Sequence, residues 1–127
     1  MLFRDEIKIV TRFTYMTRHG GFAFNDSRGC GRYRIHVANR TRYVERFIKV
    51  LAHEIIHCEQ YDTGRLLDDF WDGVDHSGMR YPTQPWEVQA MKWEKVLFDA
   101  WKQRGNISYM TRLRLQQRMD DCKPPKQ

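Results

Sequence analysis

Residues 43–61 of this chain read YVERFIKVLAHEIIHCEQY. The apolar residues in this stretch recur at spacings of three and four, which is the period of one face of an α-helix. This apolar stripe consists of Val44, Phe47, Ile48, Leu51, Ile55 and Cys58. The pattern predicts a helix with one buried face, and Thr63 and Gly64 are typical of its end.

The same predicted helix contains an HExxH motif, His53-Glu54-Ile55-Ile56-His57. Side chains four residues apart project from the same helical face, so both imidazoles can reach one metal ion, with Glu54 beside the open side of that ion. Two solvated or core histidines would be the alternative interpretation. The helical setting favours the metal site, because the apolar stripe lies on the opposite face and a predicted strand comes just before it.

A catalytic zinc site takes three protein ligands and leaves the fourth position to water, so a third ligand must come from elsewhere in the chain. We expect Glu87, in the first turn of a second predicted helix, where the small Ala90 allows close approach to the first helix. His76 is the rival and would give a site of three histidines. Glu94 is the next candidate, or a partner that orients a histidine. The remaining acidic candidates are Asp62, Asp68, Asp69, Asp72 and Asp75.

The other segments predict an α+β domain that is mainly helical, with a small antiparallel sheet before the HExxH helix. Residues 2–18 combine many β-branched residues with a helical spacing of apolar residues, and we predict a helix there. Residues 22–24 and 32–37 predict two strands that pair as an antiparallel ribbon. Two further helices are predicted, from Pro85 to about Arg104 and then through Asp121.

The connection 64–84 is long for a loop, which favours a functional role, and we expect a short strand or a lid around Phe70 and Trp71. The whole chain has 127 residues, 41% of them hydrophobic, with 4 Trp, 6 Tyr and 7 Phe. This composition excludes intrinsic disorder and suits one compact domain, which we place at residues 1–122. The last residues, 123–127, read KPPKQ and are expected to form a disordered tail.

Composition also bears on location. No apolar stretch approaches the roughly 18 residues that a membrane span requires, and the first twenty residues are rich in charge, so we expect neither a membrane span nor a secretory signal. The 3 cysteines are odd in number and form no CxxC pair. This suits a reducing compartment. We therefore expect a cytoplasmic protein.

Charge is unevenly distributed along the chain, whose net charge is +6. Residues 1–50 hold 11 basic and 4 acidic residues, residues 51–100 hold 4 and 10, and residues 101–127 hold 7 and 2. The acidic centre suits a bound cation, whereas the basic flanks suit the phosphate backbone of a nucleic acid. Nucleic acid is therefore a candidate partner, although no recognised nucleic-acid motif accompanies the charge.

Further residues extend the HExxH motif. They are Gln60-Tyr61, Trp71-Asp72-Gly73, Tyr81 and Pro85-Trp86-Glu87-Val88-Gln89-Ala90. In the combination HExxHxxQY, WxG, Y and PWExxA, residues 33–94 resemble small phage-encoded zinc metallopeptidases of the gluzincin kind, and more distantly SprT-like domains and minigluzincins. The resemblance implies a minimal zincin-like fold with the zinc ligands His53, His57 and Glu87. It also implies that Glu54 is the catalytic carboxylate.

The expected function is zinc-dependent hydrolysis of a peptide or protein substrate by a metal-activated water, with Glu54 as general base and then as proton donor to the leaving amine. Tyr81 or His76, from the long connection, can donate a hydrogen bond to the developing oxyanion, although packing explains Tyr81 equally well. If strand 32–37 lies at a sheet edge, an extended peptide can add to it. Its basic side chains would then favour acidic substrates.

The alternative function is a protein that keeps zinc without catalysis: a zinc-stabilised structural protein of a phage or virion, or a nucleic-acid-binding protein that uses the basic flanks. An intact site can serve several ends, so the motif alone does not choose between these functions. The same donor set also suits iron, cobalt or manganese. Zinc is the metal that we predict.

Overall fold

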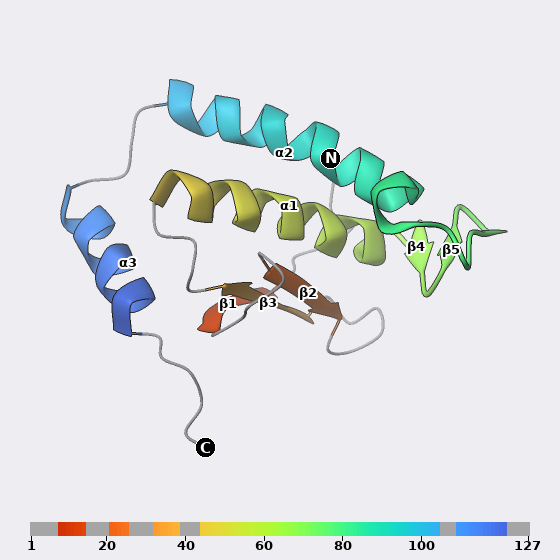
Figure 1. Cartoon of the computed structure of the whole chain (residues 1–127), viewed down its shortest axis with the longest axis horizontal. Helices are drawn as coiled ribbons and strands as arrows, with labels where there is room; N and C mark the ends of the chain where they lie inside the picture. The colour runs from red at the N-terminus through yellow and green to blue at the C-terminus, as the bar shows by residue number, and fades with distance from the viewer. Residues whose placement is uncertain (1–7, 15–20, 26–31, 39–43, 105–108, 122–127) are drawn as a thin grey trace, which may run out of the picture.

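The computed structural model describes residues 8–14, 21–25, 32–38, 44–104 and 109–121. The elements in the first part of the chain are β1 (Lys8–Thr14), β2 (Gly21–Asn25), β3 (Arg32–Ala38) and α1 (Val44–Asp62). They are followed by β4 (Leu66–Leu67), β5 (Phe70–Trp71), β6 (Val74–Asp75), η1 (Tyr81–Thr83), α2 (Pro85–Gln103) and α3 (Tyr109–Asp121). Helix α1 lies between α2 on one side and the sheet of β1, β2 and β3 on the other (Figure 1).

The larger sheet has the strand order β1-β3-β2. Strand β2 pairs antiparallel with β3, as the sequence predicts, with Gly21 opposite Val37 and Asn25 opposite Tyr33. Strand β1 pairs parallel with the other edge of β3. Because β3 is therefore the central strand, it does not meet the condition for adding a peptide at a sheet edge.

The prediction of a helix over residues 2–18 is wrong for Lys8–Thr14, which form β1. This segment contains Ile9, Val10 and Thr11, whose branched Cβ atoms restrict χ1 and favour an extended backbone. Pairing with β3 satisfies the backbone groups of this extended segment, so the local composition and the long-range contact agree.

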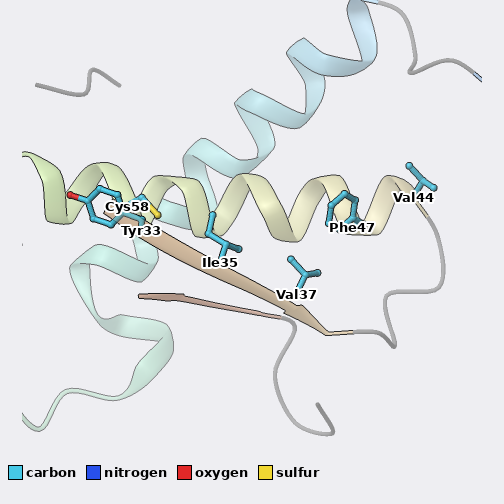
Figure 2. Packing of buried hydrophobic residues seen from close by; sticks show 6 residues of the cluster. All are labelled: Tyr33, Ile35, Val37, Val44, Phe47 and Cys58. Atoms are coloured by element: carbon cyan, nitrogen blue, oxygen red, sulfur yellow. The ribbon is translucent and has the colours of Figure 1, made fainter. Parts of the chain in front are cut away.

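The hydrophobic core lies between the sheet and α1. It consists of Tyr33, Ile35, Val37, Val44, Phe47 and Cys58 (Figure 2). Alternate residues of β3 point into this core, while Arg32 and Arg34 are exposed, which confirms the predicted period of two. Each fully buried aliphatic side chain contributes roughly 1.5–3 kcal/mol of transfer free energy, so the face shared by β3 and α1 fixes how this helix sits on the sheet.

Helix α1 confirms the predicted helix and its end. The backbone N–H and the side-chain hydroxyl of Thr63 both donate to the carbonyl oxygen of Glu59, at 2.9 Å each. Gly64 follows with φ of 77°, the left-handed conformation that commonly ends a helix. The tail 123–127 lies outside the described residues, and the assignment of residues 1–122 to one domain stays a prediction.

Helix α2 begins at Pro85, as predicted, and packs beside α1. Its first turns are buried against α1 at Trp86 and Ala90, with exposed fractions of 7% and 0%. Ala90 presents no side chain beyond Cβ, which permits the close approach of the two helices. Farther along, Trp93 and Trp101 are only half-buried, so this helix is fully buried only at its start.

The connection between α1 and α2 forms a second sheet, with β5 between β4 and β6 and both pairs antiparallel. This confirms the short strand predicted at Phe70 and Trp71. Asp68 and Asp72 occupy the tight turns at φ of 52° and 50°, a left-handed conformation that Asp tolerates better than most residues. No helix in the described part of the chain combines the length and the hydropathy needed to cross a membrane.

Candidate metal centre

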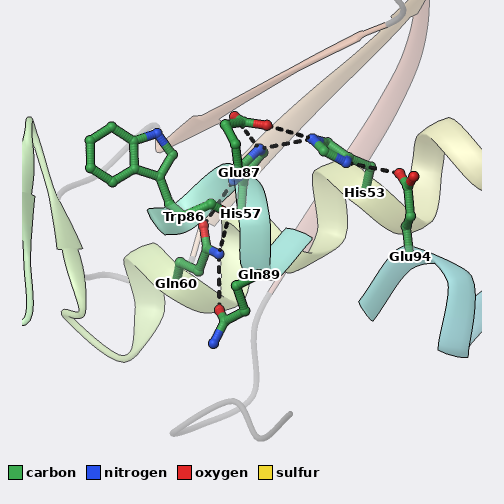
Figure 3. Close-up of polar contacts among 7 residues, drawn as sticks. All are labelled: His53, His57, Gln60, Trp86, Glu87, Gln89 and Glu94. Carbon is green, nitrogen blue, oxygen red and sulfur yellow. Dashed lines mark hydrogen bonds and ion pairs between the residues drawn. The ribbon is translucent and has the colours of Figure 1, made fainter. Parts of the chain in front are cut away.

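Three side chains from two helices meet where the first turn of α2 crosses the C-terminal half of α1 (Figure 3). Nε2 of His53 lies 3.0 Å from Oε2 of Glu87, and Nε2 of His57 lies 3.0 Å from the other carboxylate oxygen, Oε1. The two Nε2 atoms are 3.2 Å apart. The structure thus brings together the two histidines of the HExxH motif and the glutamate favoured as third ligand.

The spacing of these atoms fits a metal ion. Ligand nitrogen and oxygen atoms at about 2.0–2.1 Å from a tetrahedral zinc ion lie about 3.3 Å from one another. The two Nε2 atoms are 3.2 Å apart and each lies 3.0 Å from a different oxygen of Glu87; with one donor atom from each residue, the three atoms lie within 4.8 Å of one another. Within the described residues, His53, His57 and Glu87 are the one group of three or more potential ligands with this proximity. The cluster can therefore hold a metal ion.

A second carboxylate orients the first histidine. Oε2 of Glu94 lies 2.9 Å from Nδ1 of His53, on the side of the ring away from the cluster. A carboxylate oxygen accepts the hydrogen bond, so Nδ1 of His53 carries a proton, and Nε2 is the nitrogen that faces Glu87 and the cluster. Of the two predicted roles of Glu94, third ligand or partner of a histidine, the geometry fits the partner.

The three cluster residues are strongly coupled through charge. Burial opposes a charge on His53, but hydrogen bonds to Glu87 and Glu94 outweigh this effect and raise its pKa to about 10. Burial alone would also lower the pKa of His57, but the hydrogen bond to Glu87 outweighs this effect, so the pKa is raised overall. Burial alone would raise the pKa of Glu87, yet hydrogen bonds from both histidines lower it to about 2. Without a metal the cluster holds protons, which a cation would have to displace.

Glu54, the central acid of the motif, is buried, with an exposed fraction of 7%. Burial raises its pKa above the ordinary value, while the nearby charges of His57 and His53 act in the opposite direction. A carboxylate with a raised pKa holds a proton more readily near neutral pH, which suits a group that accepts and then returns one. The structure thus places Glu54 within electrostatic reach of the cluster.

Tyr81 and His76, the two candidates for an oxyanion donor, differ in their surroundings. Burial and the neighbouring carboxylate of Glu87 raise the pKa of Tyr81 to about 12. His76 instead contacts Met79, with 3.1 Å between Nδ1 and Sδ, and its ring lies edge-on to Trp86. Tyr81 therefore reaches the cluster, whereas His76 is not part of it and does not act as the third ligand.

The other acidic candidates also lie apart from the cluster. Asp68, Asp69, Asp72 and Asp75 are exposed on the small sheet and its turns. Asp62, at the end of α1, accepts a hydrogen bond from the hydroxyl of Tyr33 over 3.3 Å. None of them joins the ligand group found among the described residues.

Sequence reasoning missed the role of Gln60. Its side chain is fully buried and joins His57 to the start of α2 through hydrogen bonds (Figure 3). The available signal was a polar residue three positions after His57 on a helix whose neighbouring positions are buried. Such a residue is buried only with its hydrogen bonds satisfied, so it needs a partner on another element.

Comparisons with known proteins do not point to a function for this chain, so a functional proposal depends on the geometry described above. No family model matches the chain, and no curated protein or solved structure matches it. The resemblance to gluzincins therefore stays a prediction that rests on the motifs.

Proposed function

We propose that this protein is a zinc metallopeptidase of the gluzincin kind, which hydrolyses bonds in a peptide or protein substrate. The observation that carries the proposal is the convergence of His53, His57 and Glu87 beside the buried carboxylate of Glu54. A structural zinc site is normally closed by four protein ligands, whereas a catalytic site has three and an open position. The three-ligand group favours the catalytic kind.

The donor set fits zinc, because two imidazoles and one carboxylate are one of the ligand combinations of catalytic zinc sites. When bound, a zinc ion supplies Lewis-acid chemistry, lowering the pKa of a water and polarising a carbonyl group. His53 and His57 would hold it through Nε2, and Glu87 through its carboxylate. Glu94 keeps the ring of His53 in the orientation that this requires.

Glu54 is the proton carrier of the proposed reaction. Its carboxylate takes a proton from the water that attacks the carbonyl carbon of the substrate and delivers that proton to the leaving amine nitrogen. The C–N bond breaks, a C–O bond forms, and the products are a carboxylic acid and an amine. The raised pKa of Glu54 supports this role, because the group must hold the proton between the two transfers.

Tyr81 is the proposed donor to the oxyanion that develops on the carbonyl oxygen. With its pKa raised to about 12, its hydroxyl remains protonated at neutral pH and can donate. The side chain is 63% exposed, so a substrate can reach it. Its electrostatic interaction with Glu87 and Glu54 is consistent with a position near the same cluster, where a stabilising donor is needed.

The test compares the native chain with Glu54→Gln. Both proteins are loaded with zinc, their metal content is measured by elemental analysis, and both are incubated with a diverse mixture of unstructured peptides analysed by mass spectrometry. We expect cleavage by the native chain and a loss of at least about a hundredfold in Glu54→Gln, with zinc retained. The variant changes an oxygen to an amide of the same size, so a folding defect is a poor explanation of such a loss.

Two results would contradict the peptidase. The first is equal cleavage by Glu54→Gln and the native chain, because it points to a contaminating protease. The second is a zinc-loaded native chain that cleaves nothing in the mixture. The second would favour the zinc-stabilised structural or nucleic-acid-binding protein, whose basic flanks lie partly on residues outside the described ranges.

A further inference from the structure

Gln60 makes three hydrogen-bonding contacts in the interior of the protein. Its exposed fraction is 0%. Oε1 lies 2.8 Å from Nδ1 of His57, and Nε2 lies 2.9 Å from both the backbone oxygen of Trp86 and Oε1 of Gln89 (Figure 3). Both ends of one buried amide are therefore engaged, one by a cluster histidine and the other by α2.

The contact with Trp86 decides which way the amide faces. A backbone carbonyl oxygen only accepts hydrogen bonds, so the NH₂ group of Gln60 must point to it. The carbonyl oxygen of the amide then points to His57, and this oxygen also only accepts. Nδ1 of His57 must therefore carry a proton, so Nε2 is the nitrogen directed into the cluster, where a bound metal ion would take the place of the Nε2 proton.

The same amide also links the positions of two ligands. Trp86 directly precedes Glu87, so a hydrogen bond to its backbone restrains the turn of α2 that carries the third ligand. Gln60 belongs to the same helix as His57, three residues later. The side chain of Gln60 thus connects α1, which carries the two histidine ligands, to α2, which carries the glutamate ligand.

We propose that Gln60 is a positioning residue of the metal centre, which holds His57 in the Nδ1-protonated tautomer and fixes Glu87 relative to it. The inference rests on the proposed function, since a metal must bind for the positioning to matter. It is separate from catalysis, because metal affinity is measured without any substrate. Loss of such partners of metal ligands commonly weakens metal binding by tenfold to a hundredfold.

The experiment measures Zn²⁺ and Co²⁺ affinity of the full chain by competition with a chelating dye, together with the visible absorption of the Co²⁺ form. Gln60→Met keeps the length of the side chain and removes all three contacts. Gln60→Glu keeps an acceptor for His57 and loses the donor to Trp86. Gln89→Met is the matched control, because it removes the third contact and leaves the other two.

We expect affinity to fall on the order of tenfold to a hundredfold in Gln60→Met, less in Gln60→Glu, and less than about threefold in Gln89→Met. The Co²⁺ absorption should change in Gln60→Met, since the ligand geometry changes. Urea unfolding of the metal-free proteins measures how much each substitution lowers the folding stability when no metal is bound. Affinity and spectrum equal to native in a folded Gln60→Met would overturn the inference, as would an equal or greater loss in Gln60→Glu.

A measurement on the native chain covers the case in which Gln60→Met does not fold. Nitrogen NMR of the imidazoles in the zinc-loaded protein identifies the protonated nitrogen of each histidine. We expect a proton on Nδ1 of His57 and metal on Nε2, whereas metal on Nδ1 would overturn the inference. A Gln60-dependent zinc site in a chain without peptidase activity would contradict only the proposed function. A native chain that binds no zinc would contradict both.

Discussion

Nδ1 of His53 lies 2.9 Å from Oε2 of Glu94, while Nε2 of the same ring lies 3.0 Å from Oε2 of Glu87. The two glutamates are seven residues apart on α2, which is close to two helical turns, so they lie on one face of this helix. One imidazole of α1 is thus held at both nitrogens by α2. The packing of these two helices therefore decides the geometry of the metal centre.

Replacing Glu94 with Gln should weaken zinc binding on the order of tenfold to a hundredfold without unfolding the chain. The amide no longer provides a charged acceptor for Nδ1 of His53, so the ring loses part of its orientation and basicity. Asp99→Asn, an exposed position on the same helix, is the control for the loss of one negative charge. Competition with a chelator measures the affinity, and equal effects of the two changes would show that only net charge matters.

The metal-free protein should be most stable in mildly acidic solution. The pKa of His53 is raised from 6.5 to about 10 in the folded state, so its contribution is fully present below pH 6.5 and is lost as the pH rises toward 10. The pKa of Glu87 is lowered from 4.5 to about 2, so its contribution is present above pH 4.5 and is lost as the pH falls toward 2. Urea unfolding from pH 3 to pH 9 should show a maximum at roughly pH 4.5–6.5.

In this titration, Glu87→Gln is the control. Without the carboxylate, most of the pH dependence assigned to the cluster should disappear, because the hydrogen bonds from both histidines lose their charged acceptor. If the pH dependence of stability in Glu87→Gln equals that of the native protein, the titrating groups lie elsewhere in the chain.

Tyr81→Phe should lower kcat of peptide hydrolysis on the order of tenfold to a thousandfold while KM and zinc content stay near native. The side chain is exposed, so its hydroxyl contributes little to folding, and the change removes the donor to the oxyanion together with the interaction between this hydroxyl and Glu87. Steady-state kinetics with a cleaved peptide give both constants. An unchanged kcat would assign Tyr81 to packing, the other interpretation of this residue.

Ile35→Ala should lower the free energy of unfolding by about 2–5 kcal/mol, because it leaves a cavity in the core between β3 and α1. Ile35 has an exposed fraction of 0%. Val10→Ala, at a strand position with an exposed fraction of 42%, should change it by only about 0.5 kcal/mol. Urea unfolding of the two variants checks the assigned core, and similar losses for both would contradict it.

The three described helices and the proximity of His53, His57 and Glu87 could be predicted from the sequence because they depend on local patterns. The spacing of His53 and His57 and the apolar stripe both follow the period of a single helix, and Pro85 marks the start of the next one. Glu87 follows from the chemistry of the site, since a third ligand had to come from an element able to approach the first helix.

The errors concern contacts between segments distant in sequence. Strand β1 was predicted as a helix because its local patterns conflict, and only pairing with β3 resolves them. The same pairing makes β3 a central strand, which the alternation of its side chains does not reveal. Gln60 was missed for a similar reason, because its partner Trp86 is 26 residues away.

The most direct test of the central claim is the metal content of the native chain and of Glu87→Ala, measured by elemental analysis after zinc loading and extensive dialysis. We expect one zinc per native chain and a large loss in the variant, because a proposed ligand that contacts both histidines has been removed. Zinc retained equally by both proteins, or a native chain that takes up none, would contradict a metal centre built from His53, His57 and Glu87.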